Sequence, residues 1–371
     1  MTLHIFNPEH DIALASNLSN FTAPHAGRQL RNDLGFLPAL WAEDGDQILV
    51  SHEESAMKLY RRVCHRLKTL GITESLPAVN PKFTDSKVAV YRQETTSLQP
   101  WGWDRAIRRE LERMGFTEPL LPTLEQTELV RQLSHRLTSA QLLPLLQMEG
   151  TVGEAWECTT IEQVTDLLQH QGCLVLKAPW SSSGRGVRFV RSSDEMGNFQ
   201  NWISNILKTQ GSIMAEPYYN KVKDFGMEFE ADADGTIRYL GLSLFHTVNG
   251  AYEGNILATE LVKQEMISRY VSVELLDRIK QNIIGCLRLP GYVGPFGVDM
   301  MIVKSIGDGN HNSQLSIVNC QLLLHPCVEI NLRRTMGHVA LAISPTDDDI
   351  RGVMRVIYDG NHYKLKINKL R

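Results

Sequence analysis

Two apolar segments in the second half of the chain carry oxygen-bearing side chains. Asp299 lies in the segment Gly297–Val303, and Glu329 and Asn331 lie two positions apart in a second apolar segment. Because side chains alternate along a strand, Glu329 and Asn331 should share one face. Such hard oxygen ligands suit Mg²⁺, which also shares its coordination with phosphates. A solvent-facing pair is the alternative, but the apolar neighbours predict a largely covered strand.

A Ser/Gly-rich loop follows a buried strand in the middle of the chain. The apolar run Cys173–Ala178 predicts the strand, Lys177 stands near its end, and the loop Pro179–Gly186 leads into a second strand, Val187–Val190. Backbone N–H groups and hydroxyls of such a loop can surround phosphate oxygens, and Lys177 can add a positive charge. The segment is not a P-loop, because GxxxxGK[ST] is absent and a strand follows the glycines. A glycine turn between two strands would explain it equally well.

Two further features suit a bound nucleotide. The strand Ile213–Glu216 is followed by Pro217, which has no N–H, so backbone groups leave regular pairing there and could meet an adenine ring. Arg333 and Arg334 come directly after the second apolar segment and could contact a phosphate or a substrate carboxylate. Seen alone, a strand followed by a turn and a solvated pair of arginines remain adequate explanations.

Composition and charge limit the possible functions. A chain of 371 residues is long enough for two or three lobes. The formal net charge of −4 excludes a global basic field that would attract nucleic acid or anionic lipid. No apolar run has the length of a membrane span, and Met1–Pro8 lacks the features of a signal peptide. The six cysteines are scattered without a CxxC pair, so we expect reduced thiols and a cytoplasmic protein.

The elements that must position these residues can be read from the hydrophobic pattern. Strand signals at Thr2–Phe6 and Gln47–Ser51 alternate with helix signals at Glu53–Leu70 and Arg105–Met114, which predicts a small α/β unit ending near Pro119. Later helices are predicted at Leu124–Leu146, Asp194–Lys208 and Ser272–Leu289. Strand pairs are predicted at Phe225–Asp232 with Thr236–His246, at Gly297–Val303 with Leu315–Asn319, and at Met354–Asp359 with Tyr363–Asn368.

Two polar clusters leave their roles open. Asn7, Glu9, His10 and Asp11 lie between a strand end and a helix, where α/β proteins often bind ligands, although helix capping explains them nearly as well. His10 has no partner at metal-ligand spacing, which argues against a zinc site. The segment His246–Asn255 could line a substrate pocket or form a surface loop.

Taken in order, these features resemble the ATP-grasp superfamily, which includes D-alanine ligase, glutathione synthetase and many carboxylate–amine ligases. The resemblance extends from about Glu125 to Ala342. It rests on Leu133-Ser134-His135-Arg136-Leu137, on Leu174–Val187, on Glu216-Pro217-Tyr218-Tyr219, on Lys223–Phe229, on Gly297-Val298-Asp299 and on Glu329-Ile330-Asn331-Leu332-Arg333.

The resemblance implies ATP and Mg²⁺ as cofactors, and it assigns a role to each group of site residues. Lys177 would contact the α- and β-phosphates, while Asp299, Glu329 and Asn331 would bind Mg²⁺. Arg333 or Arg334 would stabilise the transferring phosphoryl group and act in catalysis together with Lys177. The phosphate lid would comprise Ser181, Ser182, Ser183, Gly184 and Gly186. The remaining nucleotide-binding set would comprise Arg136, Glu216, Pro217, Tyr218, Tyr219 and Asp224.

The resemblance also implies a fold class of α/β and α+β units. A small α/β domain of the pre-ATP-grasp type would cover residues 1–120, ATP-grasp lobe A residues 121–210, and lobe B with the metal site residues 211–371. The implied activity is a ligase that activates a small-molecule carboxylate as an acyl phosphate for attack by an amine, with no nucleic-acid or membrane partner. Many relatives are homo-oligomers.

Two departures from the family pattern keep alternatives open. Arg136 stands where members generally carry a lysine, and Leu332 replaces the proline of the Asn-Pro-Arg pattern. A kinase that stops after phosphorylating a small molecule would use the same residues. A nucleotide-binding protein that has lost its chemistry, or an interaction scaffold, is the non-enzymatic alternative.

Overall fold

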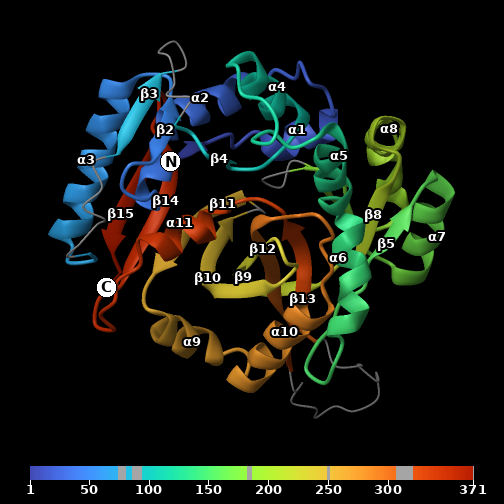
Figure 1. Cartoon of the computed structure of the whole chain (residues 1–371). Helices are drawn as coiled ribbons and strands as arrows, with labels where there is room; N and C mark the ends of the chain where they lie inside the picture. The colour runs from blue at the N-terminus through green and yellow to red at the C-terminus, as the bar shows by residue number, and fades with distance from the viewer. Residues whose placement is uncertain (74–80, 86–93, 182–185, 249–250, 306–320, 371) are drawn as a thin grey trace.

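Three sheets organise the chain, of which the computed structural model describes all residues except 74–80, 86–93, 182–185, 249–250, 306–320 and 371 (Figure 1). The first sheet is parallel and has the order β3-β2-β1-β4. Its strands are β1 (Thr2–Ile5), β2 (Gln47–Val50), β3 (Lys82–Asp85) and β4 (Ser97–Pro100). Its helices are α1 (His10–Ser16), α2 (His25–Leu34), the 3₁₀ helix η1 (Leu37–Leu40), α3 (Glu53–Thr69) and α4 (Arg105–Arg113). The predicted N-terminal α/β unit is confirmed.

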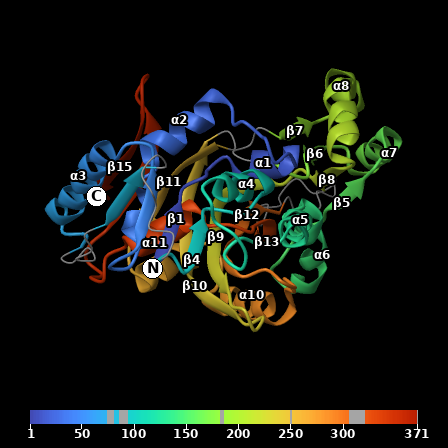
Figure 2. The same ribbon diagram turned by 45° about the horizontal axis from the view of Figure 1, so that its top comes forward.

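The second sheet is antiparallel and has the order β5-β8-β6-β7. Its strands are β5 (Trp156–Cys158), β6 (Leu174–Lys177), β7 (Val187–Val190) and β8 (Ile213–Pro217). The helices α7 (Ile161–Gln171) and α8 (Ser193–Gln210) pack on it through Val164, Leu168, Ile203 and Ile206. In both views this unit lies at the opposite end of the molecule from α3 (Figure 1, Figure 2).

The third sheet has seven antiparallel strands in the order β13-β12-β9-β10-β11-β14-β15. They are β9 (Asn220–Ala231), β10 (Ile237–Val248), β11 (Ala251–Leu257), β12 (Gly294–Lys304), β13 (Leu322–Asn331), β14 (Gly352–Tyr358) and β15 (Tyr363–Lys369). The helices of this part are α5 (Leu124–Leu133), α6 (Arg136–Leu142), the 3₁₀ helix η2 (Leu143–Leu146), α9 (Glu260–Ser268), α10 (Val273–Cys286) and α11 (Met336–Ala342). Among the described residues, no helix is long and apolar enough to cross a bilayer.

Sheet pairing and helix packing at the middle unit extend across both expected limits of lobe A. β8 lies between β5 and β6, so the second sheet continues to Pro217, beyond the limit expected at residue 210. Val130 and Leu142, from helices expected in lobe A, are buried in the core of the seven-stranded sheet instead. Sheet pairing and helix packing are long-range contacts, which a local pattern does not reveal.

Two predicted elements also differ in detail. The helix expected over Leu124–Leu146 is interrupted where Ser134 ends α5 and extended His135 caps α6, and it finishes as a 3₁₀ turn. The strand β12 pairs with β13, whereas its expected partner, Leu315–Asn319, lies outside the described residues. The last hairpin is confirmed, and its strand β15 packs beside α2 and α3, so that Ile367 is buried in one core with Phe36 and Leu67 (Figure 1).

Candidate functional site

The structure brings Asp299, Glu329 and Asn331 together at the neighbouring strands β12 and β13. Asp299 stands opposite Glu329 in the antiparallel pairing, and Asn331 Nδ2 donates a hydrogen bond to Asp299 Oδ2 at 3.1 Å. Burial, followed by the charge of the facing Glu329, raises the pKa of Asp299 to about 7. Two carboxylates held this close repel each other, and a divalent cation between them would remove that repulsion.

One arginine contacts this carboxylate pair directly, and a second contacts the neighbouring Asn331. Buried Arg136, the first residue of α6, donates from Nη2 to Glu329 Oε1 at 2.7 Å and from Nη1 to Ser181 Oγ at 2.8 Å. Arg333 donates from Nη2 to Asn331 Oδ1 at 2.9 Å. Arg136 therefore connects the start of the expected phosphate lid to the expected metal ligand Glu329.

Arg333 is held by a carboxylate of the N-terminal unit, a contact that the sequence did not indicate. Its Nε and Nη2 both bond to Asp11 of α1 at 2.8 Å. The Asp11 carboxylate raises the pKa of the Arg333 guanidinium against the effect of burial, and Arg333 in turn lowers the pKa of Asp11 against its burial. The N-terminal unit is thus joined to the carboxylate pair through one bidentate ion pair.

Arg334 does not join the carboxylates. Its guanidinium lies 4.7 Å from the ring centroid of Trp41, and its backbone N–H bonds to the carbonyl of Trp101. These contacts hold Arg334 against tryptophans of the N-terminal unit, whereas Arg333 bonds to Asn331. Asn331 also departs from the expected arrangement, because its amide oxygen accepts from Arg333 and would have to leave that bond to reach a cation.

Lys177 and Glu216, expected to hold the nucleotide, form a buried ion pair across the neighbouring strands β6 and β8. Lys177 Nζ lies 2.6 Å from Glu216 Oε2, and less than a tenth of either side chain is exposed. The pair sits where β6 runs into the lid segment, as predicted for Lys177. Of the lid residues, Ser181 and Gly186 are described, whereas Ser182, Ser183 and Gly184 lie outside the described residues.

The hinge after β8 places its two tyrosines in different surroundings, one partly buried and one exposed. Tyr219 lies edge-on to the ring of His325 with 5.5 Å between centroids, and its hydroxyl accepts from the N–H of Glu154 at 3.1 Å. Tyr218 follows Pro217 and is half exposed. Asp224, on β9, forms an ion pair with Lys221 and adds its negative charge to the field around Asp299.

His325 is a site residue that sequence reasoning missed. It lies on β13 opposite Met301, is 1% exposed, and neither ring nitrogen has a hydrogen-bond partner within the described part of the chain. Burial and the nearby Lys177 charge lower its pKa to about 3, so the ring is neutral. A neutral imidazole beside Tyr219, with both ring nitrogens available, can form a hydrogen bond with the edge of a bound base. Its only sequence signal was a histidine inside an apolar strand.

A second missed group is the buried Glu228–His338 pair. His338 Nε2 lies 3.3 Å from the Phe229 carbonyl and carries the hydrogen, while Nδ1 accepts from the Thr335 N–H at 3.1 Å and lies 3.0 Å from Glu228 Oε2. Burial, followed by the charge of Asp299, raises the pKa of Glu228 to about 8, and burial lowers the pKa of His338 to about 3. Both groups are therefore neutral at pH 7.

The Glu228 shift predicts a pH dependence of stability. A carboxyl group with a pKa of about 8 in the folded chain, against 4.5 ordinarily, stabilises the fold fully at acidic pH, and this contribution is lost as the pH rises through 8. The free energy of unfolding without Mg²⁺ should fall from about pH 5 to about pH 8, by up to about 1.4 kcal/mol per pH unit. Urea unfolding in EDTA should show a smaller slope for Glu228→Gln, and identical slopes would contradict the assignment.

A small cavity of about 10 Å³ joins the N-terminal unit to the carboxylate site and has room for about one water molecule. The helix α1 forms one wall with His10, Asp11 and Leu14. The other walls come from Ser134, Pro179, Trp180, Ser181 and Glu329–Leu332. A larger open hollow of about 730 Å³ lies against the other side of α1, where Arg31 binds Glu9 and Glu110.

The donor set fits Mg²⁺, provided that the Asn331 amide oxygen leaves its hydrogen bond with Arg333. Asp299 and Glu329 supply two facing carboxylates, one of them with a raised pKa that a cation would lower. In the described ranges, no cluster of three or more His, Cys, Asp or Glu side chains could hold a metal ion. The pair Asp299–Glu329 offers two carboxylates. This number suits Mg²⁺, which often takes only one or two protein carboxylates and fills its coordination with phosphates and water.

The chain contains two α+β units, the sheet β5-β8-β6-β7 with its helices and the large antiparallel sheet, after a small parallel α/β unit, which is the order of units expected from the sequence. No protein-family model matches the sequence, and no curated protein sequence matches it. Among solved structures, N5-carboxyaminoimidazole synthetase from Staphylococcus aureus, complexed with ADP, is 13% identical with a TM-score of 0.49, over 97% of this chain and 83% of that one. Biotin carboxylase from Campylobacter jejuni, in a β,γ-ATP complex, is 12% identical with a TM-score of 0.49, over 96% and 75%.

Proposed function

We propose that this protein is an ATP- and Mg²⁺-dependent ligase that activates a small-molecule carboxylate as an acyl phosphate for attack by an amine. One observation carries the proposal: Asp299 faces Glu329, Arg136 bonds to Glu329, Arg333 bonds to the adjoining Asn331, and Glu329 and Asn331 line a cavity beside Ser181 at the start of the lid. This arrangement of opposite charges suits a metal–triphosphate and an anionic acceptor.

Asp299 and Glu329, with Asn331 after its amide turns, would hold Mg²⁺. When bound, Mg²⁺ neutralises charge on the β- and γ-phosphates that would repel an anionic nucleophile. Lys177 would exchange part of its contact with Glu216 for the α- and β-phosphates, and the hinge from Glu216 to Tyr219 would hold the adenosine beside His325. Arg136, which already binds Ser181, would bring the lid onto the phosphates.

The reaction has two steps in which side chains mainly position the reactants. A carboxylate oxygen of the substrate attacks the γ-phosphorus, ADP leaves, and an acyl phosphate forms. The amine then attacks the acyl carbon, the C–N bond forms, and inorganic phosphate leaves. Arg333 would stabilise the negative oxygens during both transfers. The lid excludes water, because water would hydrolyse the acyl phosphate.

A coupled assay for ADP release tests the proposal across amino acids and small dicarboxylic acids. We expect a carboxylate to stimulate ADP release with hydroxylamine present, and the hydroxamate to accumulate in proportion to ADP. An amine should replace hydroxylamine and give an amide and inorganic phosphate. ADP release with a stable phosphorylated product, and without a requirement for any nucleophile, would establish the kinase alternative. Absence of Mg·ATP binding by calorimetry would exclude both reactions.

A further inference from the structure

We propose that His10, oriented by Asp104, is the general base that accepts the proton of the attacking amine. The inference rests on the proposed ligase reaction and adds a residue of the N-terminal unit to its second step. Both residues belong to sequence clusters, Asn7–Asp11 and Trp101–Asp104, that the nucleotide site does not use.

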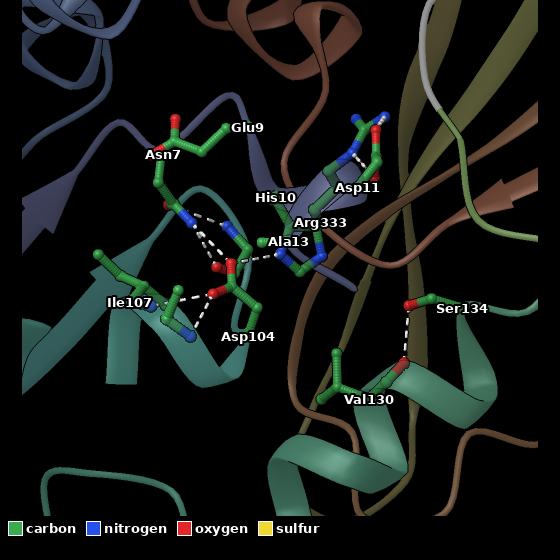
Figure 3. Close-up of polar contacts among 12 residues, drawn as sticks. Asn7, Glu9, His10, Asp11, Ala13, Asp104, Ile107, Val130, Ser134 and Arg333 are labelled. Atoms are coloured by element: carbon green, nitrogen blue, oxygen red, sulfur yellow. Dashed lines mark hydrogen bonds and ion pairs between the residues drawn. The ribbon is translucent and has the colours of Figure 1, made fainter. Parts of the chain in front are cut away.

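Asp104 is a fully engaged carboxylate. As the N-cap of α4, it accepts with Oδ1 from the N–H groups of Ala106 at 2.8 Å and Ile107 at 2.9 Å. Its Oδ2 accepts from Asn7 Nδ2 at 3.3 Å and lies 3.2 Å from His10 Nδ1 (Figure 3). Two backbone donors and a side-chain amide fix the carboxylate, so its contact with His10 has a defined direction.

This contact sets the tautomer of His10. Asp104 Oδ2 can only accept, so Nδ1 carries the hydrogen and donates it, and the lone pair is left on Nε2. Within the described part of the chain, no hydrogen bond occupies Nε2, which points away from Asp104 (Figure 3). A carboxylate behind an imidazole also stabilises the cation that forms when Nε2 takes a proton.

The ring is placed against the reaction site. His10 is 1% exposed, yet it lines the small cavity together with Ser181, Glu329 and Asn331. The backbone of Gly102 packs against the imidazole of His10. A Cβ at that position would lie 2.6 Å from the ring carbons Cγ and Cδ2. The glycine backbone is itself fixed, because its carbonyl accepts from Asn7 Nδ2 at 2.8 Å. The imidazole is therefore held rigidly beside the expected metal ligands.

Two charged residues line the cavity together with His10. Asp11 comes from α1 and is paired with Arg333, and Glu329 comes from β13. These groups would bind the acyl phosphate and its metal, whereas His10 Nε2 remains for the nucleophile. The buried His4–Asp46 pair, with 3.0 Å between Nε2 and Oδ2, has the same chemistry in the same unit but lines neither of the two cavities. It provides a matched comparison.

In the proposed step, the amine attacks the acyl phosphate and its proton moves to His10. The amine nitrogen forms the C–N bond with the acyl carbon, the bond between that carbon and the bridging phosphate oxygen breaks, and inorganic phosphate leaves with the electron pair. The nitrogen becomes positively charged in the attack, and its proton moves to His10 Nε2. The imidazolium, stabilised by Asp104, then releases the proton to phosphate or solvent as the products leave.

The test compares His10→Gln with the matched variant His4→Gln, using the carboxylate that gives most ADP release with the wild-type protein. Glutamine can still donate to Asp104 but cannot take the proton. With an alkylamine acceptor, His10→Gln should lower kcat by about 100-fold or more. With hydroxylamine, whose nitrogen is unprotonated at neutral pH, hydroxamate formation should change less than about tenfold, and Mg·ATP binding should be unaltered. His4→Gln should keep both rates.

A second variant separates base catalysis from packing. Asp104→Asn retains a helix cap, because asparagine is also a good N-cap, but it presents an N–H to His10 and moves the ring hydrogen to Nε2. It should therefore lose the alkylamine reaction selectively, as His10→Gln does. Equal losses with alkylamine and hydroxylamine, or no loss with alkylamine, would overturn the role of His10 while the ligase proposal stands. If the wild-type protein forms neither hydroxamate nor amide, the ligase proposal fails and the inference fails with it.

Discussion

Asp299→Asn should reduce ATP turnover by at least about 100-fold, because the change removes a negative charge that the metal–triphosphate requires. The same variant should be more stable than the wild-type protein in the absence of Mg²⁺ at pH 8. Asp299 faces Glu329, and burial together with that charge raises its pKa to about 7, so the ionised form is unfavourable in the fold. Asparagine keeps the shape and removes the repulsion.

The sign of the stability effect can be followed with pH. The pKa of Asp299 is higher in the folded chain than its ordinary 3.8, so its contribution to stability is complete at acidic pH and is lost as the pH rises through about 7. The advantage of Asp299→Asn should therefore be large at pH 8 and should shrink below pH 7. Thermal unfolding in EDTA at pH 6 and pH 8 measures it.

Asp277→Asn is the matched control, because Asp277 is an exposed carboxylate of α10 paired with Lys280. That variant should change neither turnover nor stability appreciably. Unchanged ATP turnover in Asp299→Asn would remove Asp299 from the metal site. A loss of turnover combined with a lower melting temperature at pH 8 would mean that the change acts through the fold instead.

The local pattern was sufficient wherever an element depends on its own residues. The strand Val187–Val190 has the predicted bounds, since its apolar residues follow directly on a Ser/Gly-rich loop. The helix α4 begins after Asp104, whose carboxylate caps it, as the transition from Trp101–Asp104 into a charged amphipathic segment predicts. The alternation in the N-terminal unit likewise indicated its parallel sheet.

Contacts between distant segments could not be predicted in this way. The sequence around Arg333 does not predict its contact with Asp11. The two residues are 322 positions apart and meet only because the N-terminal unit packs on the large sheet. The insertion of β8 between β5 and β6 is equally invisible, since β8 follows both in the chain. Period-two alternation predicted that Glu329 and Asn331 share one face, but it could not show that the Asn331 amide turns its nitrogen to Asp299.

The buried Lys177–Glu216 pair gives the second large effect, on stability and on ATP binding at once. Lys177→Met should weaken Mg·ATP binding by about 10- to 100-fold, because a charge-assisted contact to phosphate is worth about 1.5–3 kcal/mol. It should also destabilise the fold by about 3–5 kcal/mol, because Glu216 remains as an unpaired charge in a buried site.

A double variant separates these two consequences of removing Lys177. Lys177→Met with Glu216→Gln leaves no buried charge, so the free energy of unfolding should recover most of its loss, whereas ATP affinity should stay low. Lys280→Met, which breaks the more exposed pair with Asp277, should cost less than about 1 kcal/mol and leave ATP binding unchanged. Calorimetric titration with Mg·ATP and urea unfolding measure both quantities. If the double variant regained ATP affinity along with stability, Lys177 would be a structural partner of Glu216 and the phosphate contact would have to come from Arg136, which already reaches from Glu329 to Ser181.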